Sequence, residues 1–166
     1  MKKWIFVPIV ISVLLSGCLS AESGNSTGNN LTVNNPGPGK ITLQGLEFYT
    51  GLQSGLDASK AQDKPIFVYF RSESCGWCKK FEAESFTNQS IIKILNENFI
   101  LVSIDVYEQK NETTYFKVRG TPSEVFLDSN FTEITRIPGY TDNKTFLNTI
   151  NEIAILNRGL KNETRQ

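Results

Sequence analysis

Apolar positions along the chain fall into short continuous runs and into helical spacings, and the two kinds alternate from about residue 45 onward. The run that follows Pro65 and the run that ends at Asp105 are unbroken, which is typical of strands covered on both faces of a sheet. Near the C-terminus, two apolar segments flank the polar turn 128–130, which indicates a hairpin. We therefore expect strands at 45–50, 65–70, 99–104, 124–127 and 132–137.

Between these runs, apolar residues recur three or four positions apart, as on one face of a helix. Asn88 and either Thr141 or Asp142 are suited to cap helix N-termini, and Gly159 is suited to end the last helix. Helices are thus expected at 54–62, 75–86, after 88, at 113–118 and from 142 to 159. The order predicts an α/β fold with a mixed sheet of four to five strands, flanked by helices on both faces.

The predicted helix at 75–86 has one apolar side. We expect Phe81 to face the core, together with Phe86 and the later Phe99 and Phe126. The charged residues of this helix are expected in solvent: Lys79, Lys80, Glu82 and Glu84.

The first residues have the pattern of an export signal. Lys2 and Lys3 precede an apolar run at 4–15, which is shorter than the roughly 20 residues that a spanning helix needs. We interpret residues 1–17 as a signal peptide. The following Leu15-Ser16-Gly17-Cys18 resembles the lipobox of prokaryotic lipoproteins, which implies cleavage before Cys18 and a diacylglycerol on its thiol. A plain signal peptide or an uncleaved anchor with an incidental Cys is the alternative.

Residues 18–43 are rich in Ser, Gly and Asn, and they include Pro-Gly-Pro-Gly at 36–39. Such a segment has no apolar period and cannot form a packed element, so we interpret it as a flexible, lipid-anchored tether. The domain itself is expected at 44–160, followed by a tail at 161–166. The location that follows is the outer face of the cell membrane.

The sequence Asn-x-Ser/Thr, the acceptor of N-linked glycans, occurs seven times and adds support for export. Asn-rich composition without any glycan is an equally open reading. The possible glycosylation sites are Asn25, Asn30, Asn88, Asn111, Asn130, Asn143 and Asn162.

The amino-acid composition limits the kinds of binding and catalysis that the chain can support. The 17 basic and 17 acidic residues balance, so binding to nucleic acid by phosphate neutralisation is not expected. The chain has no His, which excludes Ser-His-Asp and Cys-His catalysis and any imidazole-dependent zinc site. Three Cys cannot form a four-cysteine metal site within one chain. We expect neither a metal nor a cofactor, and any chemistry falls to thiols, carboxylates or backbone groups.

The motif Cys75-Gly76-Trp77-Cys78 follows a buried strand and opens a helix, so the two sulfurs share one helix face. At the helix N-terminus, free N–H groups and the dipole favour the thiolate of Cys75. Cys78, inside the first turn, is less exposed. This asymmetry suits disulfide exchange, in which Cys75 forms a mixed disulfide and Cys78 resolves it.

Two other interpretations of the motif stay open. A Cys-x-x-Cys pair is also half a zinc site, although the chain supplies no second pair and no His. A purely structural disulfide is possible in an oxidising compartment, but so small a loop removes little unfolded-state entropy. A redox-active pair is therefore the favoured interpretation.

From about Leu46 to Leu156 the chain resembles the thioredoxin superfamily, particularly exported members with Cys-Gly-Trp-Cys-Lys-Lys after a strand that ends in Tyr-Phe. The resemblance implies a thioredoxin fold. It also implies a cis-proline at Pro122, in Val-Arg-Gly-Thr-Pro, that faces the motif and shapes substrate docking. The backbone of Thr121 would then pair with the substrate chain. Gly139 matches a glycine that keeps the docking groove open.

The sequence departs from the superfamily pattern at three positions. Ser74 stands where many cytosolic members have Trp. Tyr69 stands where they have a buried acid that is thought to assist proton transfer from the resolving thiol. Trp77 replaces the common Pro. Because redox poise depends on the dipeptide between the cysteines, the direction of electron flow does not carry over.

The function expected from the sequence is an extracytoplasmic thiol–disulfide oxidoreductase with catalytic Cys75 and Cys78. Its partners would be thiols or disulfides of exported proteins and a membrane redox donor, contacted through Gly76, Trp77, Thr121 and Pro122. It would act as a monomer. The alternative is a non-catalytic binding module in which the same cysteines form a structural disulfide.

Overall fold

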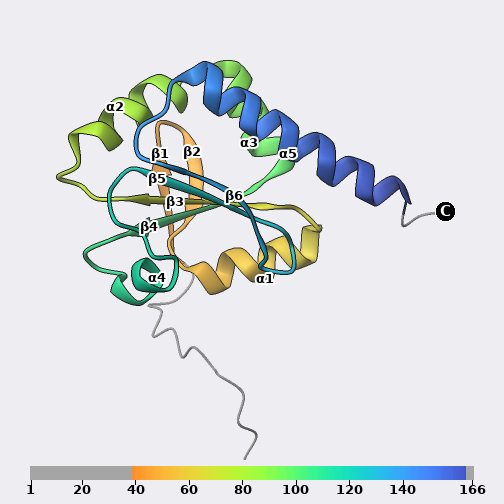
Figure 1. Ribbon diagram of the computed structural model, residues 1–166, viewed down its shortest axis with the longest axis horizontal. Helices are drawn as coiled ribbons and strands as arrows, with labels where there is room; N and C mark the ends of the chain where they lie inside the picture. The colour runs from red at the N-terminus through yellow and green to blue at the C-terminus, as the bar shows by residue number, and fades with distance from the viewer. Residues whose placement is uncertain (1–38, 164–166) are drawn as a thin grey trace, which may run out of the picture. The chain divides into compact units, whose positions relative to one another are not determined.

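The computed structural model describes residues 39–163, and they form an α/β fold around one sheet (Figure 1). The elements, in chain order, are β1 Lys40–Leu43, β2 Leu46–Tyr49, α1 Leu52–Gln62, β3 Ile66–Arg71, α2 Gly76–Ser85, α3 Gln89–Asn98, β4 Ile100–Asp105, α4 Lys110–Tyr115, β5 Ser123–Leu127, β6 Glu133–Pro138 and α5 Asn143–Glu163. The predicted signal peptide, Cys18, Asn25 and Asn30 lie outside the described residues.

The sheet has six strands in the order β1-β2-β4-β3-β5-β6, one more than the largest number expected. The neighbours β2, β4 and β3 run parallel, whereas β5 and β6 pair antiparallel to the strands beside them. The predicted class, a mixed sheet with helices on both faces, is confirmed. The strand count was wrong because a hairpin stands where one strand was expected.

That hairpin joins β1 to β2 through Gln44 and Gly45, whose φ angles are 49° and 87°. Two consecutive residues with positive φ form the primed turn that matches the twist of paired strands. Strand β1 begins at Lys40 and so lies within residues 18–43, the segment interpreted from the sequence as a tether. The reason is local: Ile41 and Leu43 alternate with polar residues and half-bury their side chains on the sheet.

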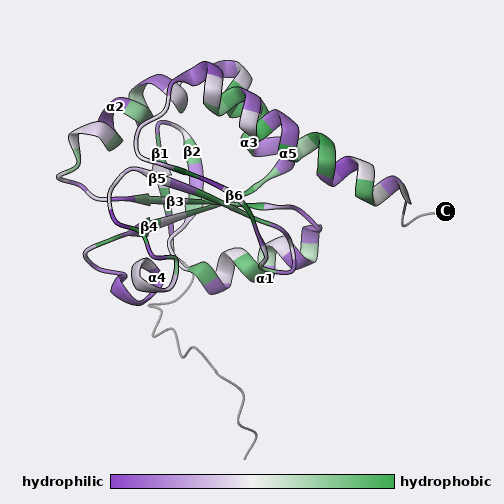
Figure 2. Ribbon diagram, viewed as in Figure 1, coloured by the Kyte–Doolittle hydropathy of each residue, from purple (hydrophilic) through white to green (hydrophobic). Residues whose placement is uncertain are grey.

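Helices α2, α3 and α5 cover one face of the sheet, and α1 and α4 cover the other (Figure 1). The hydrophobic residues concentrate in the central strands between these layers (Figure 2). We call the two sides the α2 face and the α1 face. Phe81, Phe86, Phe99 and Phe126 all lie in the core of the α2 face, as predicted.

The predicted helix starts are confirmed at two caps. The Asn88 side chain accepts hydrogen bonds from the backbone N–H groups of Ser90 and Ile91, and Asp142 does the same for Lys144 and Thr145. The predicted stop at Gly159 was wrong, because α5 continues to Glu163. A single Gly costs an exposed helix only about 1 kcal/mol, which does not force an end.

Helix α4 occupies residues 110–115, about one turn earlier than the 113–118 expected. No helix of the described part of the chain is both long and apolar enough to cross a membrane.

Candidate active site

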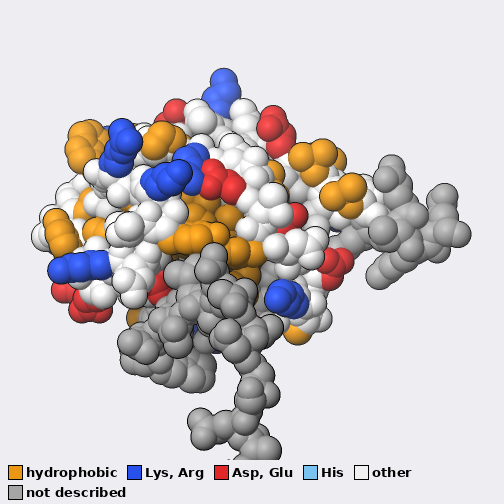
Figure 3. Space-filling view, turned by 60° about the horizontal axis from the view of Figure 1, so that its bottom comes forward, with side chains coloured by type: hydrophobic (Ala, Val, Ile, Leu, Met, Phe, Trp, Pro, Cys, Tyr) orange, Lys and Arg blue, Asp and Glu red, His pale blue; other side chains and the backbone are white. Residues whose placement is uncertain are grey.

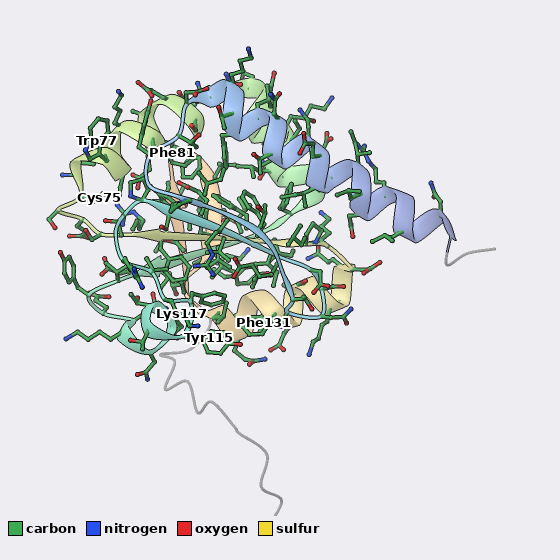
Figure 4. The ribbon with its side chains drawn as sticks, in the orientation of Figure 1. Cys75, Trp77, Phe81, Tyr115, Lys117 and Phe131 are labelled. Atoms are coloured by element: carbon green, nitrogen blue, oxygen red, sulfur yellow. A yellow bond between two sulfur atoms is a disulfide. The ribbon has the colours of Figure 1, made fainter. Side chains whose placement is uncertain are left out.

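The two motif cysteines form a disulfide at the N-terminus of α2, directly after the loop that leaves β3 (Figure 4). Their Cα atoms are 5.2 Å apart. Cys75 is the N-cap residue of the helix and is half-buried, whereas Cys78 is 0% exposed. The pair therefore has one sulfur that a partner can approach and one that only Cys75 can reach.

The helix terminus provides a local environment for charge on Cys75. Its Sγ accepts a hydrogen bond from the backbone N–H of Cys78 at 3.0 Å. Together with the positive end of the helix dipole, this N–H would stabilise a Cys75 thiolate once the disulfide opens. The roles expected from the sequence, exchange with the partner at Cys75 and resolution by Cys78, stay a prediction.

The start of β5 brings a second landmark to the same end of the sheet as the disulfide. The Thr121–Pro122 peptide bond is cis, as the resemblance implied. β5 begins immediately after Pro122 and pairs with β3, the strand that leads to Cys75. Gly139, at φ 87°, donates its N–H to the Pro122 carbonyl at 2.9 Å and holds the following loop against this turn. A groove of about 410 Å³ runs past Thr121 and Gly120.

An aromatic pair lies next to the motif. Trp77 is 58% exposed and contacts Tyr140, from the loop before α5, with ring centroids 5.2 Å apart. The Lys80 ammonium lies over both rings, at 5.1 Å and 4.6 Å. This platform presents an apolar surface and a positive charge beside Cys75. The sequence predicted Trp77 as a contact but gave no sign of Tyr140, because the two are far apart in the chain.

A buried polar cluster lies beneath Cys78. The Tyr69 hydroxyl is within donating distance of Glu82 Oε1, at 3.2 Å, and of the Cys78 carbonyl oxygen, at 3.4 Å. Glu82 also pairs with Arg71 Nε at 2.8 Å. The expectation that Glu82 faces solvent was wrong, because it is only 6% exposed. Its position four residues after Cys78, on the same helix face, was the signal that could have located it.

A second carboxyl in this region has no such partner. Glu124, in β5, is 0% exposed, and neither of its oxygens has a hydrogen-bond partner among the described residues. Burial raises the pKa of its carboxyl to about 9, so it is protonated at neutral pH. Sequence reasoning placed Glu124 in a strand but not its side chain in the core.

The described acceptor asparagines differ in their surroundings. Asn111, Asn130 and Asn162 are exposed. Asn88 uses its amide oxygen as the α3 cap, and Asn143 accepts from Ser85 and donates to the Glu84 carbonyl.

Among residues 39–163, no group of three or more His, Cys, Asp or Glu side chains is arranged to hold a metal ion. Positively and negatively charged side chains are interspersed on the face turned to the viewer in Figure 3, and neither charge forms a large patch there.

A disulfide that caps a helix after a central parallel strand, with a cis-proline leading into the neighbouring strand, defines the thioredoxin-fold class of thiol proteins. Comparison with known families agrees, since the thioredoxin-like domain matches residues 52–154. The chain therefore belongs to the thioredoxin-like family.

Curated relatives match over limited stretches. The chain is 41% identical over 64 residues to spermatogenesis-associated protein 20 of Mus musculus, covering 39% of this chain and 8% of that protein. It is 27% identical over 119 residues to the thiol:disulfide interchange protein DsbD of Actinobacillus pleuropneumoniae, covering 68% of this chain and 20% of that protein. The match thus spans a fifth or less of the length of these relatives.

Solved structures show the same fold. A thioredoxin from Thermus thermophilus superposes with a TM-score of 0.59 at 23% identity, covering 64% of this chain and 85% of that one. A DsbH oxidoreductase superposes with a TM-score of 0.56 at 18% identity, covering 78% of this chain and 96% of that one.

Proposed function

We propose that this protein is a thiol–disulfide oxidoreductase that exchanges disulfides with exported proteins through Cys75 and Cys78. The observation that carries the proposal is the difference in access between the two sulfurs. A partner thiolate can reach the half-buried Cys75, whereas the buried Cys78 is held where it can attack only the bond to Cys75. A structural disulfide would not need one of its sulfurs at an open helix terminus.

The partner's chain would dock beside the cis bond. The backbone of Thr121, directly before the cis bond, would pair with an extended segment of the partner. Gly76 and Trp77 would contact the same segment from the other side of Cys75, and the Trp77–Tyr140 surface would take an apolar side chain. The relative DsbD, named as a thiol:disulfide interchange protein, supports the reaction class.

The proposed location is outside the cytoplasm, on a lipid anchor at Cys18. The support is the sequence alone: the apolar run, the lipobox-like residues before Cys18 and the polar segment that follows. A membrane donor would then re-reduce the protein. We expect no lipid on a Cys18→Ser variant, measured by incorporation of labelled fatty acid. Label on that variant would refute the anchor.

Turnover tests the proposed reaction. In reduction of insulin by dithiothreitol, wild type should accelerate precipitation, Cys75→Ala should show no acceleration, and Cys78→Ala should accumulate mixed disulfides. Ser74→Ala, which changes an exposed neighbour without a thiol, is the matched control and should keep full activity. Absence of turnover in wild type, with a disulfide that dithiothreitol does not reduce, would contradict the proposal and favour a binding module.

A further inference from the structure

Glu124 is fully buried, and its carboxyl has no hydrogen-bond partner among the described residues. A carboxyl in this position destabilises the fold that contains it. It lies two residues after Pro122, within a strand whose other side chains are buried. Nothing in the packing of β5 requires an acid there, since its neighbours Val125, Phe126 and Leu127 are apolar.

The strand register places Glu124 on the side of the sheet that carries the disulfide. Glu124 pairs directly with Tyr69 of β3. Side chains alternate along a strand, so Glu124 shares its face with Phe126. Tyr69 and Phe126 belong to the buried cluster that contains Cys78, and the Tyr69 hydroxyl lies 3.4 Å from the Cys78 carbonyl oxygen. Glu124 is therefore the direct cross-strand neighbour of Tyr69, and Tyr69 in turn contacts the backbone of Cys78.

The other ionisable groups near Glu124 either keep their proton or form an ion pair. From β3, Tyr69 has a pKa raised far above its usual value, by burial and then by Glu82, so it keeps its proton. From α2, Glu82 is ion-paired with Arg71. β6 presents Ile137 opposite Glu124, and α5 adds apolar side chains such as Phe146. Among these described groups, Glu124 is the carboxyl that holds a proton and makes no hydrogen bond.

We propose that Glu124 exchanges one proton with Cys78 each time the disulfide opens or closes, an inference that rests on the proposed function. In opening, a partner thiolate attacks Cys75 Sγ and forms a mixed disulfide. The Cys75–Cys78 bond breaks, its electron pair moves to Cys78 Sγ, and the Glu124 carboxyl protonates that sulfur. Closing is the reverse: the Glu124 carboxylate takes the proton, and the Cys78 thiolate attacks Cys75 Sγ and releases the partner thiolate.

Burial makes such a relay useful. Cys78 is 0% exposed, so water cannot deliver or remove its proton directly. Burial raises the pKa of Glu124 to about 9, so its carboxyl holds a proton at neutral pH that it can give to a thiolate. Glu124 would thus occupy, from a different strand, the role that Tyr69 cannot perform.

The first test is a titration of Cys78 as the lone thiol, in the full chain with Cys18→Ser and Cys75→Ser, followed by thiolate absorbance in the ultraviolet. Coupling to Glu124 should give two steps separated by about one pH unit or more. Adding Glu124→Gln should leave one step. Adding Glu112→Gln is the matched control, because Glu112 is a buried glutamate of α4 on the α1 face, and it should leave two steps. Superimposable curves for the parent and Glu124→Gln would overturn the proposal.

A second measurement needs no substitution and so does not depend on the folding of a variant. Infrared difference spectra of the wild-type protein, reduced minus oxidised, should show the carbonyl stretch of a protonated carboxyl shifting or losing intensity on reduction. A spectrum without any change in that band would overturn the proposal. Neither measurement uses a protein partner, so a failure of insulin turnover leaves both results interpretable, and a failure here leaves the exchange reaction standing.

Discussion

The two faces of the sheet are packed with different types of apolar side chain. On the α2 face, aromatic rings form a continuous cluster in which Phe67 contacts the rings of Phe48, Phe86, Phe126 and Phe146. On the α1 face, branched aliphatic side chains predominate, among them Ile66, Val68, Val102 and Ile104. The disulfide, Tyr69, Glu82 and Glu124 all belong to the aromatic side.

The two faces also differ in their polar groups, because the disulfide lies on the α2 face. On the α2 face, Tyr69 packs its ring in the aromatic cluster while its hydroxyl contacts Glu82, so apolar packing and polar groups occur together there. The aliphatic face packs the sheet against α1 and α4 (Figure 2) and holds neither motif cysteine. Substitutions on the α1 face should therefore change stability alone, whereas those on the α2 face can change both stability and redox behaviour.

The largest expected effect comes from the centre of the aromatic cluster. Phe67→Ala removes ring contacts to five neighbours and leaves a cavity, so we expect a loss of about 3–5 kcal/mol in the free energy of unfolding, measured with urea on the oxidised protein. Ile104→Val on the α1 face is the reference, with an expected loss of about 0.5–1.5 kcal/mol. Equal losses would show that the aromatic cluster is not the main source of packing energy.

The next effect concerns pH. Unfolding exposes Glu124, whose pKa then returns from about 9 to its usual 4.5, so the unfolded state binds fewer protons between these values. This contribution to stability is fully present below pH 4.5 and is lost as the pH rises through 9. Wild type should lose about 1 kcal/mol or slightly more per pH unit relative to Glu124→Gln between pH 6 and 8, in urea unfolding. Parallel pH profiles for the two proteins would contradict the burial of a protonated acid.

A last prediction tests the aliphatic face. A Cβ at Gly55 of α1 would lie 2.2 Å from Val102 Cγ2, so Gly55→Ala should cost about 1–3 kcal/mol by overpacking. Combining it with Val102→Ala should cost less than the sum of the two single changes, because the clash is removed. Disulfide exchange should be unchanged in all three variants. Additive costs would mean that the helix shifts instead of pressing on Val102.

Sequence reasoning located what local pattern determines. The unbroken runs of β3 and β4, the caps Asn88 and Asp142, and the helix-opening cysteines all follow from neighbours in the chain. The β1–β2 hairpin was missed because Gln44-Gly45 is a less common pair than Asn-Gly at a primed turn.

The polar cluster was missed for a different reason. Burial of Glu82 depends on Arg71, eleven residues earlier, and burial of Glu124 depends on the register that sets it opposite Tyr69. Neither relation can be read from a helical or strand period, because each arises only when separate elements pack together.

The position of Trp77 gives the molecule its own optical signal. The chain has two tryptophans, and this one lies between the paired cysteines and against Tyr140. Loss of the adjacent sulfur–sulfur bond changes the surroundings of an emitting indole without any attached dye. Reduction of this disulfide by dithiothreitol should therefore change the native fluorescence of the protein, because Trp77 is one residue away from Cys78.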